Sequence, residues 1–236
     1  MGGILNRYKI RILQCVSFLL SIWGIYSFNS SSLLISLATY SFLEIFAGNA
    51  TLHRYYGHGS FKLSEGKKMV LTWLAHHIGV GSVLGWVGHH RWHHQYSDTP
   101  QDIHSPTQNG IFHILFGSWK VNIPRRLIRD LIKDQRLIWW HRNYFIYHAC
   151  VIFGLALLSP WALVYLYAIP NTLCLCSGYL IAILPHLKGT VENSIVTEIL
   201  TFGEGWHQAH HDSPDDYRFS KFDLTGLTIH HILRSK

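Results

Sequence analysis

Two long stretches of this 236-residue chain contain no charged residue, and they constrain the fold more than any other feature. One covers the thirty-two residues between Arg11 and Glu44, and the other covers the forty-five residues between Arg142 and Lys188. A helix needs about 20 residues to cross a bilayer core that is about 30 Å thick. Each stretch is therefore long enough for two membrane-spanning helices joined by a tight turn. The predicted spans are residues 11–28, 32–51, 143–160 and 162–186.

The positions of the basic residues support this path through a membrane. All 20 Lys and Arg residues lie in residues 7–11, at the start of the first predicted span, in residues 54–142 or in residues 188–236. The turns that join the first span to the second and the third to the fourth have none. Basic residues are enriched on the cytosolic side of membrane proteins. Both termini and the segments 52–142 and 187–236 are therefore predicted to be cytosolic. The alternative, a soluble all-α protein with buried helices, would not be expected to separate charge in this way.

The composition narrows the possible classes of function. Charged residues make up 14% of the chain, against about 25% in a typical soluble domain. The net charge of +7 would by itself allow a nucleic-acid-binding protein, but such proteins are not usually this apolar. We therefore expect a lipid bilayer and no nucleic acid as a partner. The four cysteines lie in apolar runs without a CxxC pair, and we interpret them as small hydrophobic residues.

Two further segments bear on the number of spans. No small-residue cleavage site follows the first span, so we predict a retained anchor and not a signal peptide. The segment 69–88 is apolar but contains two His and four Gly, and we expect it to lie at the membrane interface. The resulting prediction is a single domain over 1–236, an all-α integral membrane protein with four transmembrane helices and a cytosolic helical cap.

Eighteen histidines are the second unusual feature, and eight of them form three short motifs in segments predicted to be cytosolic. The motifs read HRYYGH, HRWHH and HQAHH, and their histidines are His53, His58, His90, His93, His94, His207, His210 and His211. In HxxHH the three imidazoles are neighbours on one helix face, so two such helices offer six nitrogen ligands. The HxxxxH pair is about 140° apart around an ideal α-helix. That pair would either serve two ions or lie where a helix ends, as Gly57 suggests.

Eight histidines exceed the number of ligands that one metal ion needs, so the pattern indicates two ions. Neutral imidazole binds Zn, Cu, Fe or Ni, and the ligand type alone does not select among them. A metal-binding transporter or sensor is the alternative from another functional class. A transporter is expected to place its polar ligands at mid-membrane, whereas these motifs lie outside the apolar runs.

The motifs resemble those of the membrane-bound fatty acyl desaturases of the acyl-CoA desaturase type, whose histidine boxes read HRxxxH, HRxHH and HxxHH. The stretch HRWHHQYSDTPQDIH is similar to the second box and its tail, S-[DE]-T-x-x-D-x-H. The stretch GEGWHQAHHDSPDDYR is similar to the third box, GEGxHxxHHxxPxDYR. The resemblance covers about residues 40–220. Alkane hydroxylases and carotenoid-modifying enzymes share histidine boxes but do not typically combine the GEG lead-in with the DYR tail.

The resemblance implies two iron ions held by nine histidines. The ninth ligand of the family follows the fourth span, and His186 in IAILPHLKG matches it. Where the family has an asparagine that engages one iron through water, this chain has Ala182. The implied reaction is the oxygen-dependent removal of two hydrogens from adjacent methylenes of an acyl chain. Breaking such C–H bonds requires a redox-active cofactor, which zinc is not.

The resemblance also gives expectations for residues near the boxes. Trp86 matches a position at the bend of the substrate tunnel. Arg54 and Arg91 match residues that contact a head group or carboxylates. The positions that match family residues around the metal ligands are Asp98, Asp102, His104 and Glu204.

The expected partners follow from the same resemblance. The sequence has no flavin, haem or nicotinamide motif, so electrons are expected from an external donor, such as cytochrome b5 or a ferredoxin-like protein. The basic cytosolic face would suit an acidic donor. A fatty acyl chain is the expected substrate, and a related lipid hydroxylase would differ only in its product. The expected location is a bacterial inner membrane, or the endoplasmic reticulum in a eukaryote.

Overall fold

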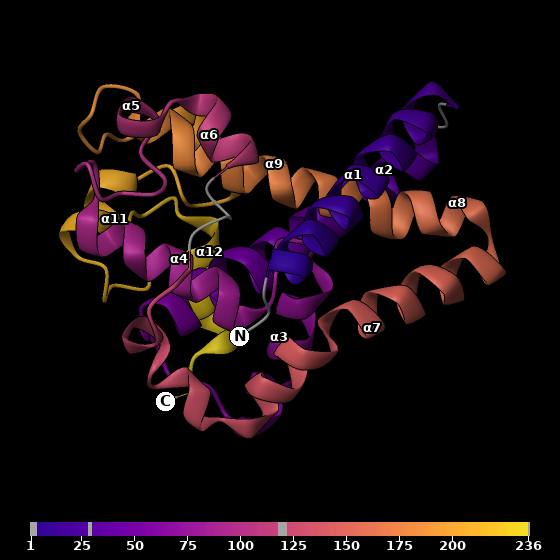
Figure 1. The fold of residues 1–236 in the computed structure, drawn as a ribbon, viewed down its shortest axis with the longest axis horizontal. Helices are drawn as coiled ribbons and strands as arrows, with labels where there is room; N and C mark the ends of the chain where they lie inside the picture. The colour runs from indigo at the N-terminus through magenta and orange to yellow at the C-terminus, as the bar shows by residue number, and fades with distance from the viewer. Residues whose placement is uncertain (1–3, 28–29, 118–121, 236) are drawn as a thin grey trace.

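The computed structural model describes residues 4–27, 30–117 and 122–235, and all of its regular elements are helical (Figure 1). No strand occurs within these ranges, which confirms the all-α prediction. The α-helices are α1 (Ile4–Tyr26), α2 (Ser30–Leu43), α3 (Glu65–His77), α4 (Val83–Tyr96), α5 (Pro106–Asn109), α6 (Ile111–Phe116), α7 (Gln135–Leu158), α8 (Pro160–Leu163), α9 (Ile169–Ile183), α10 (Ile195–Thr201), α11 (His207–Asp212) and α12 (Leu224–Thr228). The π-helices are η1 (Glu44–Gly57), η5 (Val164–Ala168) and η7 (Ile229–Leu233), and the short 3-10 helices are η3 (Arg125–Ile128), η4 (Leu131–Lys133) and η6 (Leu184–His186). Residue 28 of the first predicted span and the chain ends 1–3 and 236, which were predicted to be cytosolic, lie outside the described ranges.

Three helical stretches in the described ranges are long and apolar enough to cross a membrane. They are Tyr8–Tyr26 in α1, Ser30–Gly57 formed by α2 and η1, and Pro160–His186 formed by α8, η5, α9 and η6. They correspond to the predicted spans 11–28, 32–51 and 162–186. The second continues six residues beyond its predicted end, so the first histidine motif belongs to the same helical stretch.

The third predicted span, 143–160, falls mostly in α7 and is not among these three stretches. Arg136 and Arg142 occupy the first half of α7, so its uncharged part, Asn143 to Leu158, has only sixteen residues. That length is less than the about 20 residues that cross a bilayer core. The side chains of Phe153, Leu157 and Leu158 are nevertheless 66%, 71% and 79% exposed, which is unusual for apolar residues in contact with water.

The arrangement of the helices brings the histidine motifs together at one end of the molecule (Figure 1). Helices α1, α2, α7 and α8 extend away from a rounded part that contains α4, α11 and α12. Helices α1 and α2 pack against α9 and η5, whereas η1 packs against α3, α4 and α12. The stretch formed by α2 and η1 therefore runs from the extended part into the rounded part and carries its histidines there.

A buried apolar core fixes η1 against its neighbours. Ala47 and Leu52 of η1 pack with Leu74 of α3 and with Val83 and Val87 of α4, and all five are buried. Removing such side chains from water is the main favourable term in helix packing. Helix α4 begins where the Ser82 hydroxyl accepts a hydrogen bond from the Gly85 backbone N–H at 3.3 Å, a typical N-terminal cap.

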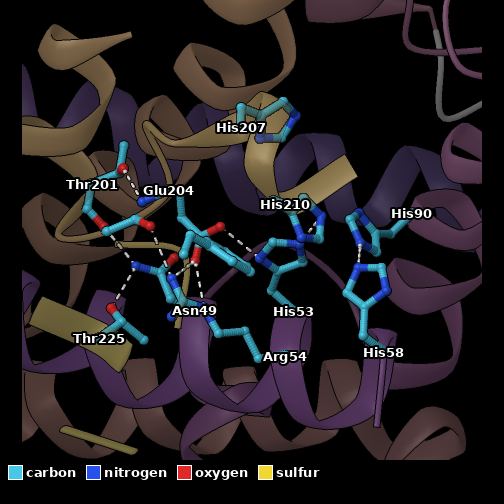
Figure 2. Close-up of polar contacts among 12 residues, drawn as sticks. Asn49, His53, Arg54, His58, His90, Thr201, Glu204, His207, His210 and Thr225 are labelled. Carbon is cyan, nitrogen blue, oxygen red and sulfur yellow. Dashed lines mark hydrogen bonds and ion pairs between the residues drawn. The ribbon is translucent and has the colours of Figure 1, made fainter. Parts of the chain in front are cut away.

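Asn49 joins η1 to the C-terminal part of the chain (Figure 2). Its side-chain amide donates to the Thr201 carbonyl at 2.6 Å and to the Thr225 hydroxyl at 3.2 Å, and the residue is 2% exposed. Replacing Asn49 with leucine should lower the free energy of unfolding by about 1–3 kcal/mol, because both acceptors lose a donor in a buried place. Thermal unfolding in detergent measures the change. Asn143→Leu is the control, because its hydrogen bond lies at the surface; equal shifts in the two variants would contradict this role for Asn49.

Candidate metal centre

The first histidine motif lies on a π-helix, which explains its unusual spacing. His53 lies within η1 and His58 directly follows its last residue, Gly57, as predicted for a pair at a helix end. The His58 backbone N–H donates to the His53 carbonyl at 3.2 Å. This bond over five residues defines a π-helix and makes the two histidines neighbours, with ring centroids 5.1 Å apart.

The two HxxHH motifs lie on α4 and α11, and each divides its histidines between two clusters. In an α-helix, residues i and i+4 differ by about 40° in direction, whereas residues i+3 and i+4 differ by about 100°. His90 and His94 of α4 therefore share one cluster and His93 belongs to the other. On α11, His210 is the residue that is separated from the other two.

Nine histidines offer ring nitrogens that gather in two clusters, each with all its nitrogens within 4.8 Å of one another. The five-histidine group consists of His53, His58, His90, His94 and His210. The four-histidine group consists of His93, His186, His207 and His211. The structure thus brings together every histidine that the sequence marked as a candidate ligand, including His186 from η6, which is fully buried.

The spacing of the ring nitrogens fits metal ions. The Nε2–Nε2 distances are 2.7 Å for His58–His90 and 2.9 Å for His53–His210 (Figure 2). They are 2.9 Å for His94–His210, 3.1 Å for His186–His207 and 3.2 Å for His207–His211. Two nitrogens that each lie about 2.1 Å from one ion are separated by about 3 Å when they meet it at a right angle. Both the spacing and the donor type are those of a site built for imidazole-binding metals.

Burial lowers the pKa of several of these imidazoles and so favours the neutral form, which is the form that binds metal. Burial is the largest cause that lowers the pKa of His58 to about 3. Burial is also the largest cause that lowers the pKa of His211 to about 2. Burial also lowers the pKa of His94 and His207. A free nitrogen lone pair is therefore available at neutral pH in both groups.

Three carboxylates contact the Nδ1 atoms of three of these histidines. The Nδ1 atoms of His53, His93 and His186 lie 2.7, 2.8 and 2.9 Å from carboxylate oxygens of Glu204, Asp102 and Asp98, respectively. A carboxylate at Nδ1 fixes the proton there and turns the Nε2 lone pair the other way. For His53 and His186, Nε2 is the atom that faces another histidine of the group.

A tight turn after α4 brings two of these carboxylates together. Asp98 has a backbone φ of 57°, a left-handed conformation in which aspartate is enriched among non-glycine residues. Its backbone N–H donates to the Asp102 carboxylate at 2.9 Å, and the His104 N–H donates to the same carboxylate at 2.8 Å. His104 thus contributes its backbone to the turn, and its ring lies 6.1 Å from that of His93. Burial lowers the pKa of His104 to about 3.

A cavity of about 130 Å³ lies beside the two groups. His53, His93 and His207 line part of it, and the other walls are mostly apolar. Trp86 lines the cavity and stacks on His90, with ring centroids 4.9 Å apart and an angle of 20° between the rings. The cavity is also lined by His104, Ile78, Val80, Leu175 and Ala182.

Comparison with known families adds a direct finding. The family model described as fatty acid desaturase matches residues 30–227. The chain belongs to the fatty acid desaturase family. The resemblance found in the sequence motifs is thereby confirmed.

Several curated proteins are similar to this desaturase-family chain. Hex-5-enoyl-[acyl-carrier protein] acetylenase of Moorena producens (strain JHB) is 29% identical over 211 residues, which cover 76% of this chain and 65% of the relative. Acyl-CoA 5-desaturase AL21 of Anemone leveillei is 26% identical over 79% of this chain and 63% of its own length. Delta(9)-fatty-acid desaturase fat-7 of Caenorhabditis elegans is 27% identical over 79% of this chain and 64% of its own length. The chain thus spans just under two thirds of the length of these relatives.

The desaturase-family site also contains an ion-pair network that the sequence analysis missed in part. Arg54 is fully buried and lies 2.9 Å from Glu204 and 2.7 Å from Asp223. Burial alone would raise the pKa of Glu204, but the charges of His53 and Arg54 lower it to about 2. Glu204 is therefore a carboxylate that contacts both Arg54 and His53 (Figure 2). Arg54 was expected to contact a head group or carboxylates, but Asp223 belongs to no motif, and no pattern in the sequence points to it.

Proposed function

We propose that this chain is an oxygen-dependent fatty acyl desaturase, which introduces a double bond into an acyl chain at a centre of two iron ions. The observation that carries the proposal is the pair of histidine groups, with neutral imidazoles at metal-ligand spacing beside a mostly apolar cavity. The five-histidine group would hold one ion and the four-histidine group the other. When bound, the iron pair supplies the oxygen-dependent redox chemistry that side chains cannot provide.

The residues of the chain have separate tasks in this proposal. The apolar cavity walls exclude water and hold adjacent methylenes of the acyl chain near the histidine groups. Trp86 forms part of the cavity wall and stacks on His90, which also lines the cavity. Glu204, Asp102 and Asp98 keep their histidines in the tautomer that binds metal.

The membrane arrangement supports the same assignment. We propose that α7 crosses the bilayer as a fourth span, because its second half exposes large apolar side chains. In Figure 1 the connected ends of α7 and α8 lie in the same direction from the rounded part as the C-terminal end of α1 and the N-terminal end of α2. Both helix pairs then act as hairpins in the membrane, with the histidine groups on the cytosolic side, where the basic segments lie.

Electrons would come from a separate donor protein of the cytochrome b5 or ferredoxin type. The exposed residues Arg125, Arg126 and Arg129 lie on or next to η3, which packs against α4. Helix α4 carries His90, so a donor bound to this basic surface would lie near the five-histidine group. Charge complementarity mainly guides the encounter between such partners.

Expression in a host that lacks its own desaturase tests the function directly. We expect new unsaturated chains in the lipids, detected by chromatography with mapping of the double bond. A triple bond would instead favour acetylenation, which one relative's name makes the second candidate, and a hydroxyl group would favour a lipid hydroxylase. Only saturated chains from an iron-loaded protein supplied with oxygen and reductant would contradict the proposal.

The contact between Asp102 and His93 gives a further prediction. Asp102→Asn keeps the size of the side chain but removes the charge that fixes the His93 tautomer. The affinity for iron should fall about 10- to 100-fold, as for other partners of metal-binding histidines, and titration against a competing chelator measures it. Asp215→Asn, at an exposed position in the tail of the third box, is the control. Unchanged affinity in Asp102→Asn would show that Asp102 does not orient His93.

A further inference from the structure

Glu44 is a buried carboxyl group within an apolar helical stretch, and the proposed chemistry does not use it. The residue is 4% exposed and lies in Ser30–Gly57, one of the stretches that are apolar enough to cross a membrane. Ionisable groups in such segments are costly and are usually paired and functional. The Glu44 Oε1 atom accepts a hydrogen bond from the Ser177 hydroxyl of α9 at 2.5 Å. The thiol of Cys174 on the same helix lies next to the same carboxyl group.

The carboxyl group of Glu44 lies at one end of the cavity beside the histidine groups. Among the residues of η1 that line this cavity, Glu44 is the farthest from His53, nine positions away. Among the lining residues of α9, Cys174 is the farthest from His186, twelve positions away. Twelve residues correspond to about 18 Å along a helix. Because Glu44 and Cys174 contact each other, the two helices meet at this level.

The lining residues show that the cavity stops at Glu44. The structure describes all of α2, which precedes Glu44, and none of its residues lines the cavity. Gly48, about one turn from Glu44 towards His53, does line it. A Cβ atom at Gly48 would lie 3.4 Å from the Glu44 Oε2 atom. Because Gly48 has no side chain, no atom at this position of η1 lies between the Glu44 carboxyl group and the cavity.

We propose that Glu44, held by Ser177, forms the closed end of this cavity and sets the greatest length of acyl chain that the cavity accepts. The inference rests on the proposed function, because it assigns the cavity to the acyl chain. The methyl end of a longer chain would have to displace the carboxyl group. Displacement would leave the Ser177 hydroxyl and the carboxyl group without their partners in apolar surroundings, which is unfavourable. Glu44 is thus a specificity determinant and takes no part in the reaction itself.

Three variants separate the volume of the Glu44 side chain from its charge and from general damage. Glu44→Ala removes the end wall, whereas Glu44→Gln keeps its size. Cys176→Ala is the matched control, because Cys176 is exposed on α9 and does not line the cavity. Saturated acyl-CoA thioesters from hexanoyl to stearoyl are offered to each purified protein in detergent, and native mass spectrometry measures binding. Chromatography of the products, with iron, oxygen and reductant present, measures turnover.

We expect an upper limit of chain length that is the same in the unchanged protein, Glu44→Gln and Cys176→Ala. In Glu44→Ala the limit should increase by about two to four carbon atoms, because truncation of a buried side chain leaves a cavity. Gly48→Leu should have the opposite effect and shorten the accepted chain, since its side chain would project into the space next to Glu44.

Binding decides the inference independently of turnover. An unchanged limit in a folded Glu44→Ala protein, or no limit in the unchanged protein, would overturn it. If Glu44→Ala does not fold, Gly48→Leu decides: a shorter limit supports the assignment, and the same limit as in the unchanged protein overturns it. Binding without any unsaturated product from any chain would count against the proposed function, while the binding limits would still establish or overturn the role of Glu44.

Discussion

Replacing His207 with alanine should abolish the formation of unsaturated product and remove iron from the protein. His207 is 3% exposed, and its Nε2 atom lies 3.1 Å from that of His186 and 3.2 Å from that of His211. It therefore occupies the centre of the four-histidine group. Loss of residues that only orient a metal ligand costs about 10- to 100-fold, so we expect loss of the ligand itself to lower activity by more than about 100-fold. Lipid chromatography and metal analysis of the same preparation measure the two effects.

His231→Ala is the matched control for this variant. His231 is exposed near the C-terminus and belongs to neither histidine group, so its replacement should leave both product and iron unchanged. A His207→Ala protein that keeps its iron and most of its activity would refute the assignment of the four-histidine group. Equal losses in the two variants would indicate that general damage, and not ligand loss, was measured.

Replacing Arg54 with alanine should destabilise the protein more than replacing Asn49 or any surface residue. The Arg54 side chain is fully buried between Glu204 and Asp223, which are buried as well. Without Arg54, both carboxylates would remain in the interior without their main counter-charge. Breaking a buried ion pair in this way costs about 3–5 kcal/mol. For a chain of this size that corresponds to a fall in melting temperature of about 10 °C, which thermal unfolding in detergent measures.

Arg136→Ala provides the comparison for Arg54. Arg136 also pairs with two carboxylates, those of Asp134 and Glu65, but half of its side chain is exposed. Surface ion pairs contribute little to stability because water solvates the separated charges well. The melting temperature of Arg136→Ala should therefore stay close to that of the unchanged protein. Similar falls in melting temperature in both variants would contradict the prediction that the buried ion pairs of Arg54 stabilise the protein more than the surface ion pairs of Arg136.

Patterns that depend on local spacing could be predicted from the sequence. The two uncharged stretches predicted four spans, and three of them appear as long apolar helical stretches in the described residues. The HxxHH motifs predicted ligands on helix faces, because the direction of each side chain follows from the α-helical repeat. The site of His186 followed only from the family resemblance, since a single histidine at a helix end has no spacing to interpret. In the structure it joins three histidines from α4 and α11.

Features that depend on contacts between distant segments could not be predicted in the same way. The π-helical hydrogen bonds of η1, which packs against α3 and α4, were not predicted from the local sequence. His76 lies in the segment 69–88, which was expected at the membrane interface, and it is fully buried, stacks on Trp140 and contacts the Thr72 carbonyl at 2.8 Å. The pairing of Arg54 with Asp223 joins residues 169 positions apart. Such pairs become visible only when the chain is folded.

The most direct test of the proposed centre is metal analysis combined with iron X-ray absorption on the purified, active protein. If the two histidine groups bind a pair of iron ions, the protein should contain two irons per chain. Their ligands should be mostly imidazole nitrogens at about 2.1 Å, close to the distance known for zinc and histidine. Protein that desaturates acyl chains without bound iron, or whose iron is held mainly by sulfur, would contradict the account.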